Sequence, residues 1–155
     1  MSVLELRVPP PLVALCAAAL MWLAAWLPKT AALTFALPWR IPVAVALIIA
    51  GIAIALAGMA AFRKARTTIN PLKPHTASAI VTSGVYQWSR NPMYAGVLLA
   101  LTGWGVYLSN PVSALALPLF VAYLNRFQIK PEERALTTKF GAEYTAYTQR
   151  VRRWL

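Results

Sequence analysis

Polar side chains that could take part in chemistry are concentrated in two segments of the sequence. The first, Thr82–Gly96, places Tyr86, Arg90, Asn91 and Tyr94 around a proline that suits the first position of a helix. The free N–H groups and partial positive charge of a helix start favour a carboxylate or phosphate ligand. The same residue types also collect at membrane interfaces without a catalytic role, so a binding site and an interfacial belt both stay open.

The second segment, Arg126–Glu133, ends in an adjacent pair of acids in a chain that has 4 acidic residues altogether. At the edge of a membrane, Glu132 and Glu133 either neutralise a neighbouring cation such as Arg126 or Lys130, or receive a cationic ligand. A third interpretation is structural, because acids in a first helical turn complement the helix dipole by about 0.3–1 kcal/mol.

The composition indicates what kind of protein must position these residues. Hydrophobic residues make up 59% of the 155, charged residues make up 12%, and the formal net charge is +11. This apolar excess excludes a disordered chain and is unusual for a water-soluble protein. We therefore predict a single domain, residues 1–155, that is integral to the membrane and whose basic flanks contact membrane lipids. We expect no nucleic acid partner.

Four apolar stretches without Asp or Glu predict membrane-spanning helices. They are Leu12–Leu27, Ile41–Phe62, Pro92–Leu108 and Val112–Phe127. The last two are separated by Ser109, Asn110 and Pro111, which allow only an antiparallel hairpin. Pro118 is expected to kink the fourth helix near Ala114.

Small residues recur along one face of the second and of the third helix, and small residues let helices approach closely in lipid. They are Ala44, Gly51 and Gly58 in the second, and Gly96, Ala100 and Gly103 in the third. The first set predicts a packing seam within the chain or between subunits. The second set leaves room for a flat ligand or for another helix.

The charge distribution predicts the orientation of the bundle. Lys and Arg are concentrated in the connection 63–91 and in the tail after Phe127, whereas the hairpin turn has none. The positive-inside tendency then places both termini and this connection in the cytoplasm.

An apolar stripe after Pro131 predicts a C-terminal amphipathic helix that lies on the membrane surface or caps the bundle. The stripe consists of Leu136, Phe140, Tyr144, Tyr147 and Val151. The predicted fold is therefore all-α, a polytopic membrane helical bundle of about four transmembrane helices followed by this amphipathic helix.

Two motifs match the pattern of one family. Ile80–Gly96 resembles the V-T-S-G-x-Y-x-x-x-R-[HN]-P-x-Y-x-G of isoprenylcysteine carboxyl methyltransferases, and Glu132–Val151 resembles their E-E-x-x-L-x-x-x-F-G-x-x-Y-x-x-Y-x-x-x-V. Related membrane methyltransferases that act on phospholipid amines carry looser versions. The resemblance implies an S-adenosylmethionine-dependent enzyme without a metal, with S-adenosylhomocysteine as product. It implies two generic transmembrane helices in residues 1–62 and the cofactor-binding catalytic part in residues 75–155.

The resemblance also implies roles for individual residues. Glu132 is expected to face the transfer site, and the expected catalytic residues are Glu132, Arg126 and Gln128. Relatives carry an arginine shortly before the glutamates, where this chain has Gln128, and Arg126 or Lys130 is the expected substitute within one helical turn. The implied cofactor-binding residues are Ser78, Ala79, Ile80, Val81, Tyr86, Arg90, Asn91, Pro92, Met93, Tyr94, Gly96 and Glu133. Asn91 stands where many relatives have histidine, and His75 either contributes or is a solvated interfacial residue.

The expected function is methyl transfer from S-adenosylmethionine to a lipophilic acceptor at the cytoplasmic membrane face, with a carboxylate, an amine and a thiol all open as the accepting group. Two other function classes share features with the sequence. Sterol and steroid reductases that use NADPH carry a similar R-H-P-x-Y element, but they are longer and lack the adjacent glutamates. Small four-helix transporters typically place an acid within a membrane helix, and none of the apolar stretches contains one.

Overall fold

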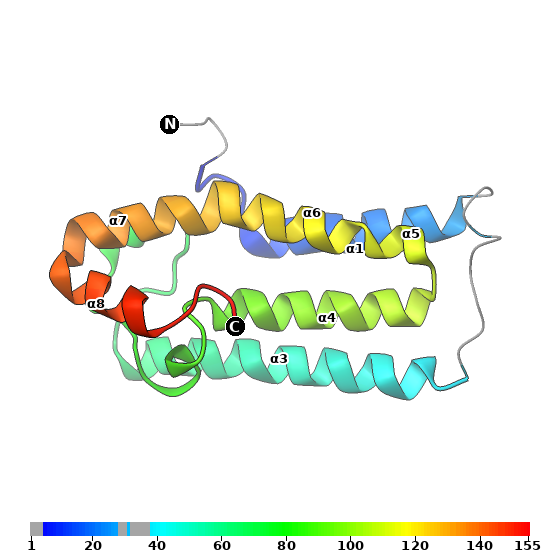
Figure 1. Ribbon diagram of the computed structural model, residues 1–155, viewed down its shortest axis with the longest axis horizontal. Helices are drawn as coiled ribbons and strands as arrows, with labels where there is room; N and C mark the ends of the chain where they lie inside the picture. Colours follow the sequence, from blue (N-terminus) through cyan, green and yellow to red (C-terminus); the bar gives the residue numbers. More distant parts are fainter. Residues whose placement is uncertain (1–4, 28–30, 32–37) are drawn as a thin grey trace.

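The computed structural model of the protein describes residues 5–27, 31 and 38–155. Within these residues the chain is helical and has no β-strand, as predicted. The main helices are α1 (Pro10–Trp26), α3 (Arg40–Lys64), α4 (Pro92–Leu108), α5 (Pro111–Ala114), α6 (Ala116–Tyr123), α7 (Lys130–Phe140) and α8 (Ala142–Arg150). In Figure 1, α4 lies between α3 on one side and α1, α5 and α6 on the other.

The small-residue stripe of α3 packs directly against α4. The buried residues of α3 are Ala44, Gly51 and Gly58. A Cβ atom added to Gly51 would collide with the backbone carbonyl of Gly96, and one added to Gly96 would collide with the carbonyl of Gly51. The predicted packing seam is therefore confirmed and lies within the chain. A helix, and not a ligand, occupies the small-residue face of α4.

A tight hairpin joins α4 to α5, as predicted. The side chain of Asn110 caps α5 by accepting hydrogen bonds from two backbone N–H groups at 2.9 and 3.3 Å. The helix is then interrupted at Leu115, between α5 and α6. In a regular helix the ring of Pro118 would clash with the carbonyl of Ala114, four residues earlier. This clash accounts for the predicted break near Ala114.

The C-terminal part differs from the single amphipathic helix that was expected to start at Pro131. Instead, α6 continues through a π-helical segment (Leu124–Ile129) into α7, so the helix runs through the proline. Pro131 has no N–H to donate to the carbonyl of Phe127, four residues before it. That carbonyl accepts a hydrogen bond from the N–H of Leu6 at 3.0 Å. The first residues of the described chain thus compensate for the missing donor.

The apolar stripe after the proline is divided between two helices. The chain turns at Gly141, where φ is 53°, a conformation that side chains disfavour. Leu136 therefore lies on α7, whereas Tyr144 and Tyr147 lie buried on α8. α8 folds back toward the start of α4, and Figure 1 shows it below α7 at one end of the bundle.

Two helices in the described ranges are long and apolar enough to cross a membrane, namely α3 and the continuous run Pro111–Phe140. α1 and α4 are apolar but have 17 residues each, roughly 26 Å at 1.5 Å per residue. The count of four spanning helices therefore stays a prediction. Large apolar side chains such as Leu15, Ile49 and Leu119 point outward and are more than half exposed, as suits contact with lipid.

We expect Gly51→Val to lower the melting temperature of the detergent-solubilised protein by about 3–10 °C, because the added side chain would meet the backbone of α4. Ala53→Val, on the exposed face of the same helix, is the matched control and should shift it by less than about 2 °C. Thermal unfolding followed by circular dichroism measures both. Equal melting temperatures for the two variants would contradict the seam.

Candidate active site

A cavity at one end of the bundle collects most of the predicted site residues. Its walls come from the end of α3, the connection between α3 and α4, the start of α4, and helices α7 and α8. The predicted residues that line it are Ala79, Ile80, Val81, Tyr86, Arg90, Asn91, Met93, Tyr94, Glu132 and Glu133. The two motifs, which the hairpin of α4 and α5 separates in sequence, therefore meet at one cavity.

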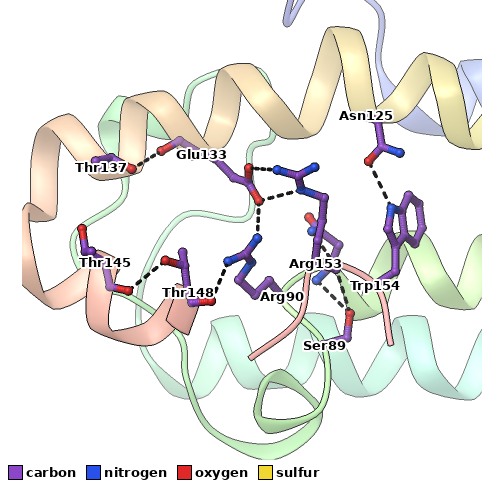
Figure 2. A network of polar contacts seen from close by, with 10 residues as sticks. Ser89, Arg90, Asn125, Glu133, Thr137, Thr145, Thr148, Arg153 and Trp154 are labelled. Carbon is purple, nitrogen blue, oxygen red and sulfur yellow. Dashed lines mark hydrogen bonds and ion pairs between the residues drawn. The ribbon is translucent and has the colours of Figure 1, made fainter. Parts of the chain in front are cut away.

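Glu133 is held by two arginines (Figure 2). Arg153 donates from Nε to Oε1 at 3.0 Å and from Nη2 to Oε2 at 2.6 Å, and Arg90 donates from Nη2 to Oε1 at 2.9 Å. A bidentate pair of this kind fixes the geometry of both side chains. The hydrogen bond to Glu133 raises the pKa of Arg153. The negative charge of Glu133 is thus neutralised within this cluster.

Glu132, the preceding residue, has different surroundings. Tyr94 Oη donates to its Oε2 at 3.5 Å, and the Gln128 side chain also interacts with the carboxyl group. A hydrogen bond of this length is weak, but those of catalytic groups often shorten only when a ligand binds. In the described part of the chain no cationic side chain forms an ion pair with Glu132. A partly buried carboxylate is costly without a positive partner, so this position favours a cationic ligand.

The remaining acids do not reach the cavity. Glu5 pairs with Arg126 at 3.3 Å and with Arg134 at 2.7 Å, and Glu143 is exposed on α8. Among residues 5–27, 31 and 38–155, no group of three or more His, Cys, Asp or Glu side chains is placed to hold a metal ion. Within these ranges Glu132 is therefore the acid that faces the cavity without a counter-ion.

Gln128 connects the carboxyl group to the wall of the cavity. Its side chain is buried in the π-helical segment, and its Nε2 donates to the carbonyl of Pro71 at 2.7 Å. It also interacts with the Tyr94 hydroxyl as well as with Glu132. A π-helical turn is rare and often lies at a functional site. Here it brings an uncharged amide to the position where relatives were expected to have an arginine.

Tyrosine side chains surround the two glutamates. Tyr86, Tyr144 and Tyr147 line the cavity together with Tyr94. Burial raises the pKa of Tyr147 to about 12. Burial, with a further contribution from the nearby glutamates, raises the pKa values of Tyr86 and Tyr144. Tyr147 Oη donates to the carbonyl of Tyr86 at 2.8 Å. These residues stay protonated at neutral pH and provide aromatic faces that can stabilise a cation.

Neither substitute proposed for the family arginine reaches the cavity. The Arg126 side chain is 55% exposed and is paired with Glu5. Lys130 is also exposed and is not part of the cavity wall. The structure therefore places neither side chain where it could replace the arginine at this cavity. Arg126 is held away from the cavity because it forms an ion pair with Glu5, which lies far away in sequence.

Four other predicted residues lie outside the cavity wall. Ser78 supports the connection, because its backbone N–H donates to Thr67 Oγ1 at 2.9 Å. Pro92 begins α4 and borders a separate apolar groove. Gly96 belongs to the seam with α3. His75 is exposed and contributes only its carbonyl, which accepts from Lys139 Nζ at 2.7 Å.

Several residues of the cavity were not predicted as site residues. Phe62 ends an apolar stretch without any signal of a ligand site, and segment 68–71 has only turn residues. Tyr144 and Tyr147 belong to the second motif but were assigned to an apolar stripe. Arg153 does not line the cavity but pairs with Glu133, which does. In sequence it was part of a basic tail, and no local pattern distinguished it from its neighbours.

Sequence comparison assigns the chain to a family. The model of the phospholipid methyltransferase family matches residues 39–143. The chain belongs to this family. The matched range extends from α3 into α8 and contains Tyr94, Glu132 and Glu133, whereas Glu5 and Arg153 lie outside it.

Individual relatives match less than half of the chain. An uncharacterized protein of Haemophilus influenzae is 46% identical over 63 residues, which is 41% of this chain and 100% of that protein. Protein-S-isoprenylcysteine O-methyltransferase B of Arabidopsis thaliana is 43% identical over 72 residues, 46% of this chain. The human protein-S-isoprenylcysteine O-methyltransferase is 40% identical over 72 residues. The match spans 36% and 25% of the lengths of these two methyltransferases. No solved structure matches the chain.

Proposed function

We propose that the protein is an S-adenosylmethionine-dependent methyltransferase that acts on a lipophilic acceptor at the cytoplasmic face of the membrane. One observation carries the proposal. Of the two glutamates at the start of α7, Glu133 is neutralised by Arg90 and Arg153, whereas Glu132 faces the cavity without a counter-ion in the described residues. A fixed carboxyl group among tyrosine rings suits a cationic ligand.

The cavity fits the chemical groups of S-adenosylmethionine. Its sulfonium is a cation, for which Glu132 and the tyrosines provide a carboxylate and aromatic faces. Its carboxylate requires N–H donors, and the Nε of Arg90 is buried without a hydrogen-bond partner in the described part of the chain. Apolar side chains such as Phe62 and Ile80 offer a wall for a flat ring. When bound, the cofactor supplies an electrophilic methyl group.

The residues of the cavity would contribute mainly by positioning. A nucleophile must lie about 3 Å from the methyl carbon and in line with the departing sulfur, and fixing this geometry lowers the barrier substantially. Tyr86, Tyr144 and Tyr147 are buried and exclude water from the site. Glu132 holds the positive charge in place, and it can accept a proton from an acceptor that must be deprotonated before it attacks.

The charges of the site favour an amine acceptor over a carboxylate. Arg90 is the cation of the cavity wall, and its donors serve Glu133 and, in this proposal, the carboxylate of the cofactor. Gln128 carries no charge, and Arg126 is paired with Glu5. An acceptor carboxylate would therefore meet the charge of Glu132 without a compensating cation among the described residues. A lipid amine would instead find a proton acceptor in Glu132.

The basic residues near the cavity support a cytoplasmic location for this end of the bundle. Arg63 and Lys64 end α3, and Lys130 and Arg134 lie on α7 beside the cavity. Positive residues flanking membrane helices favour the cytoplasmic side. The family match favours methyl transfer over the reductase and transporter alternatives.

We expect Glu132→Gln to reduce kcat/KM at least about 100-fold, because the isosteric amide cannot neutralise the sulfonium. Its melting temperature should not fall, since the substitution removes a partly buried charge that has no ionic partner in the described chain. Glu143→Gln, at an exposed acid of α8, is the matched control and should keep full activity. Incorporation of radiolabelled methyl groups into extracted lipids measures both. Full activity of Glu132→Gln would remove this residue from the site.

We expect phosphatidylethanolamine in vesicles to accept at least about ten times more label than an S-prenylcysteine carboxylate at equal concentration, because the cavity has no free cation for the carboxylate in the described residues. Gln128→Arg restores a positive side chain next to Glu132 and should shift the ratio toward the carboxylate. Preferential labelling of the carboxylate by the unmodified protein would contradict an amine acceptor.

A further inference from the structure

The segment after α8, Val151–Leu155, is attached to the start of α4. The backbone N–H of Arg90 donates to the carbonyl of Arg152 at 2.9 Å. The side-chain Nδ2 of Asn91 donates to the carbonyl of Arg153 at 2.9 Å. Asn91, which was expected to bind the cofactor, thus holds this segment as well as lining the cavity.

The same segment is attached to the long helix that carries the glutamates. The guanidinium group of Arg153 forms the bidentate pair with Glu133, and Trp154 Nε1 donates to Asn125 Oδ1 at 3.0 Å. Figure 2 shows the side chains of Arg153 and Arg90 converging on the carboxylate of Glu133. The segment therefore connects the two halves of the cavity.

We propose that Arg153 is a positioning residue whose bidentate pair with Glu133 directs Glu132 into the cavity. This inference rests on the proposed function, because it concerns how Glu132 meets a cationic ligand. Successive residues of an α-helix point about 100° apart. Because Arg153 holds the Glu133 side chain in one orientation, it fixes the rotation of this turn of α7 and with it the direction of Glu132.

Holding Glu133 in one orientation requires the planar, two-pronged guanidinium group of an arginine. A lysine carries the same charge but contacts a carboxylate at one point, so it does not define the orientation of the carboxylate plane. Arg90 does not replace Arg153, because its Nη2 contacts only Oε1 of Glu133 and its Nη1 donates to the carbonyl of Thr148 at 3.1 Å. The orientation of Glu133 thus depends on Arg153, which lies outside the family-matched range.

The test compares the affinities of the purified protein for S-adenosylmethionine and S-adenosylhomocysteine by isothermal titration calorimetry, since only the first ligand carries the sulfonium charge. Arg153→Lys keeps the net charge and loses the fork, and we expect the ratio of the two affinities to fall about three- to tenfold. Arg152→Lys is the matched control. Its side chain has no ion pair in the described chain, and its ratio should stay within about twofold.

Two further measurements separate positioning from general support of the fold. In a Glu133→Gln background, Arg153→Lys should change the ratio of the two affinities no further, because Arg153 influences Glu132 only through its pair with Glu133. If Arg153 only supported the fold, Arg153→Lys would lower the melting temperature and would weaken the binding of both ligands by the same factor. An unchanged ratio in Arg153→Lys overturns the inference.

The variant Glu132→Gln distinguishes a failure of this inference from a failure of the proposed function. If the ratio falls in Glu132→Gln but not in Arg153→Lys, the positioning role is refuted and the role of Glu132 stands. If the ratio is unchanged in Glu132→Gln, the proposed role of Glu132 is refuted, and the inference about Arg153 falls with it.

Discussion

The ion pairs of Glu133 with Arg90 and Arg153 hold together the two parts of the chain that form the cavity. Arg90 precedes α4, Glu133 lies at the start of α7, and Arg153 follows α8. The three side chains are largely or partly buried, where ion pairs are stronger than at the surface but costly to leave incomplete. Loss of one partner would therefore disturb the positions of the other two, and with them the approach of Tyr94 to Glu132.

The distribution of arginines among the acids gives two adjacent glutamates different ionic surroundings. Glu5 and Glu133 each pair with two arginines, although the chain has 15 Lys and Arg residues for 4 acids. With so many more cations than acids, each carboxyl group would be expected to have an ionic partner. Glu132 faces the cavity without one in the described residues. The surrounding tyrosines and Gln128 suit the cationic ligand that the proposed methyl transfer requires.

Local sequence patterns predicted the helices and their seam. Apolar runs and small residues at seven-residue spacing are visible within a short stretch of sequence, and they determine which residues form a helix and which face of it packs. Local patterns also located the two motifs that meet at the cavity. They did not predict that the helix continues through Pro131, because proline is favoured at a helix start and disfavoured in a helix interior. The contact of the Leu6 N–H with the Phe127 carbonyl, which compensates for the proline, comes from a distant part of the chain. Nor did local patterns predict the pairing of Arg126 with Glu5, which are 121 residues apart, or the role of Arg153. Those contacts depend on the folded topology.

The central claim is that Glu132 and the tyrosines of the cavity surround the reacting sulfur of the cofactor. An experimental structure of the protein with S-adenosylhomocysteine bound tests this most directly, through the distance between the ligand sulfur and the carboxylate of Glu132. The account predicts a distance within about 6 Å, the range over which a carboxylate or an aromatic ring stabilises a cation. A ligand bound with its sulfur away from both Glu132 and Tyr94 would contradict it.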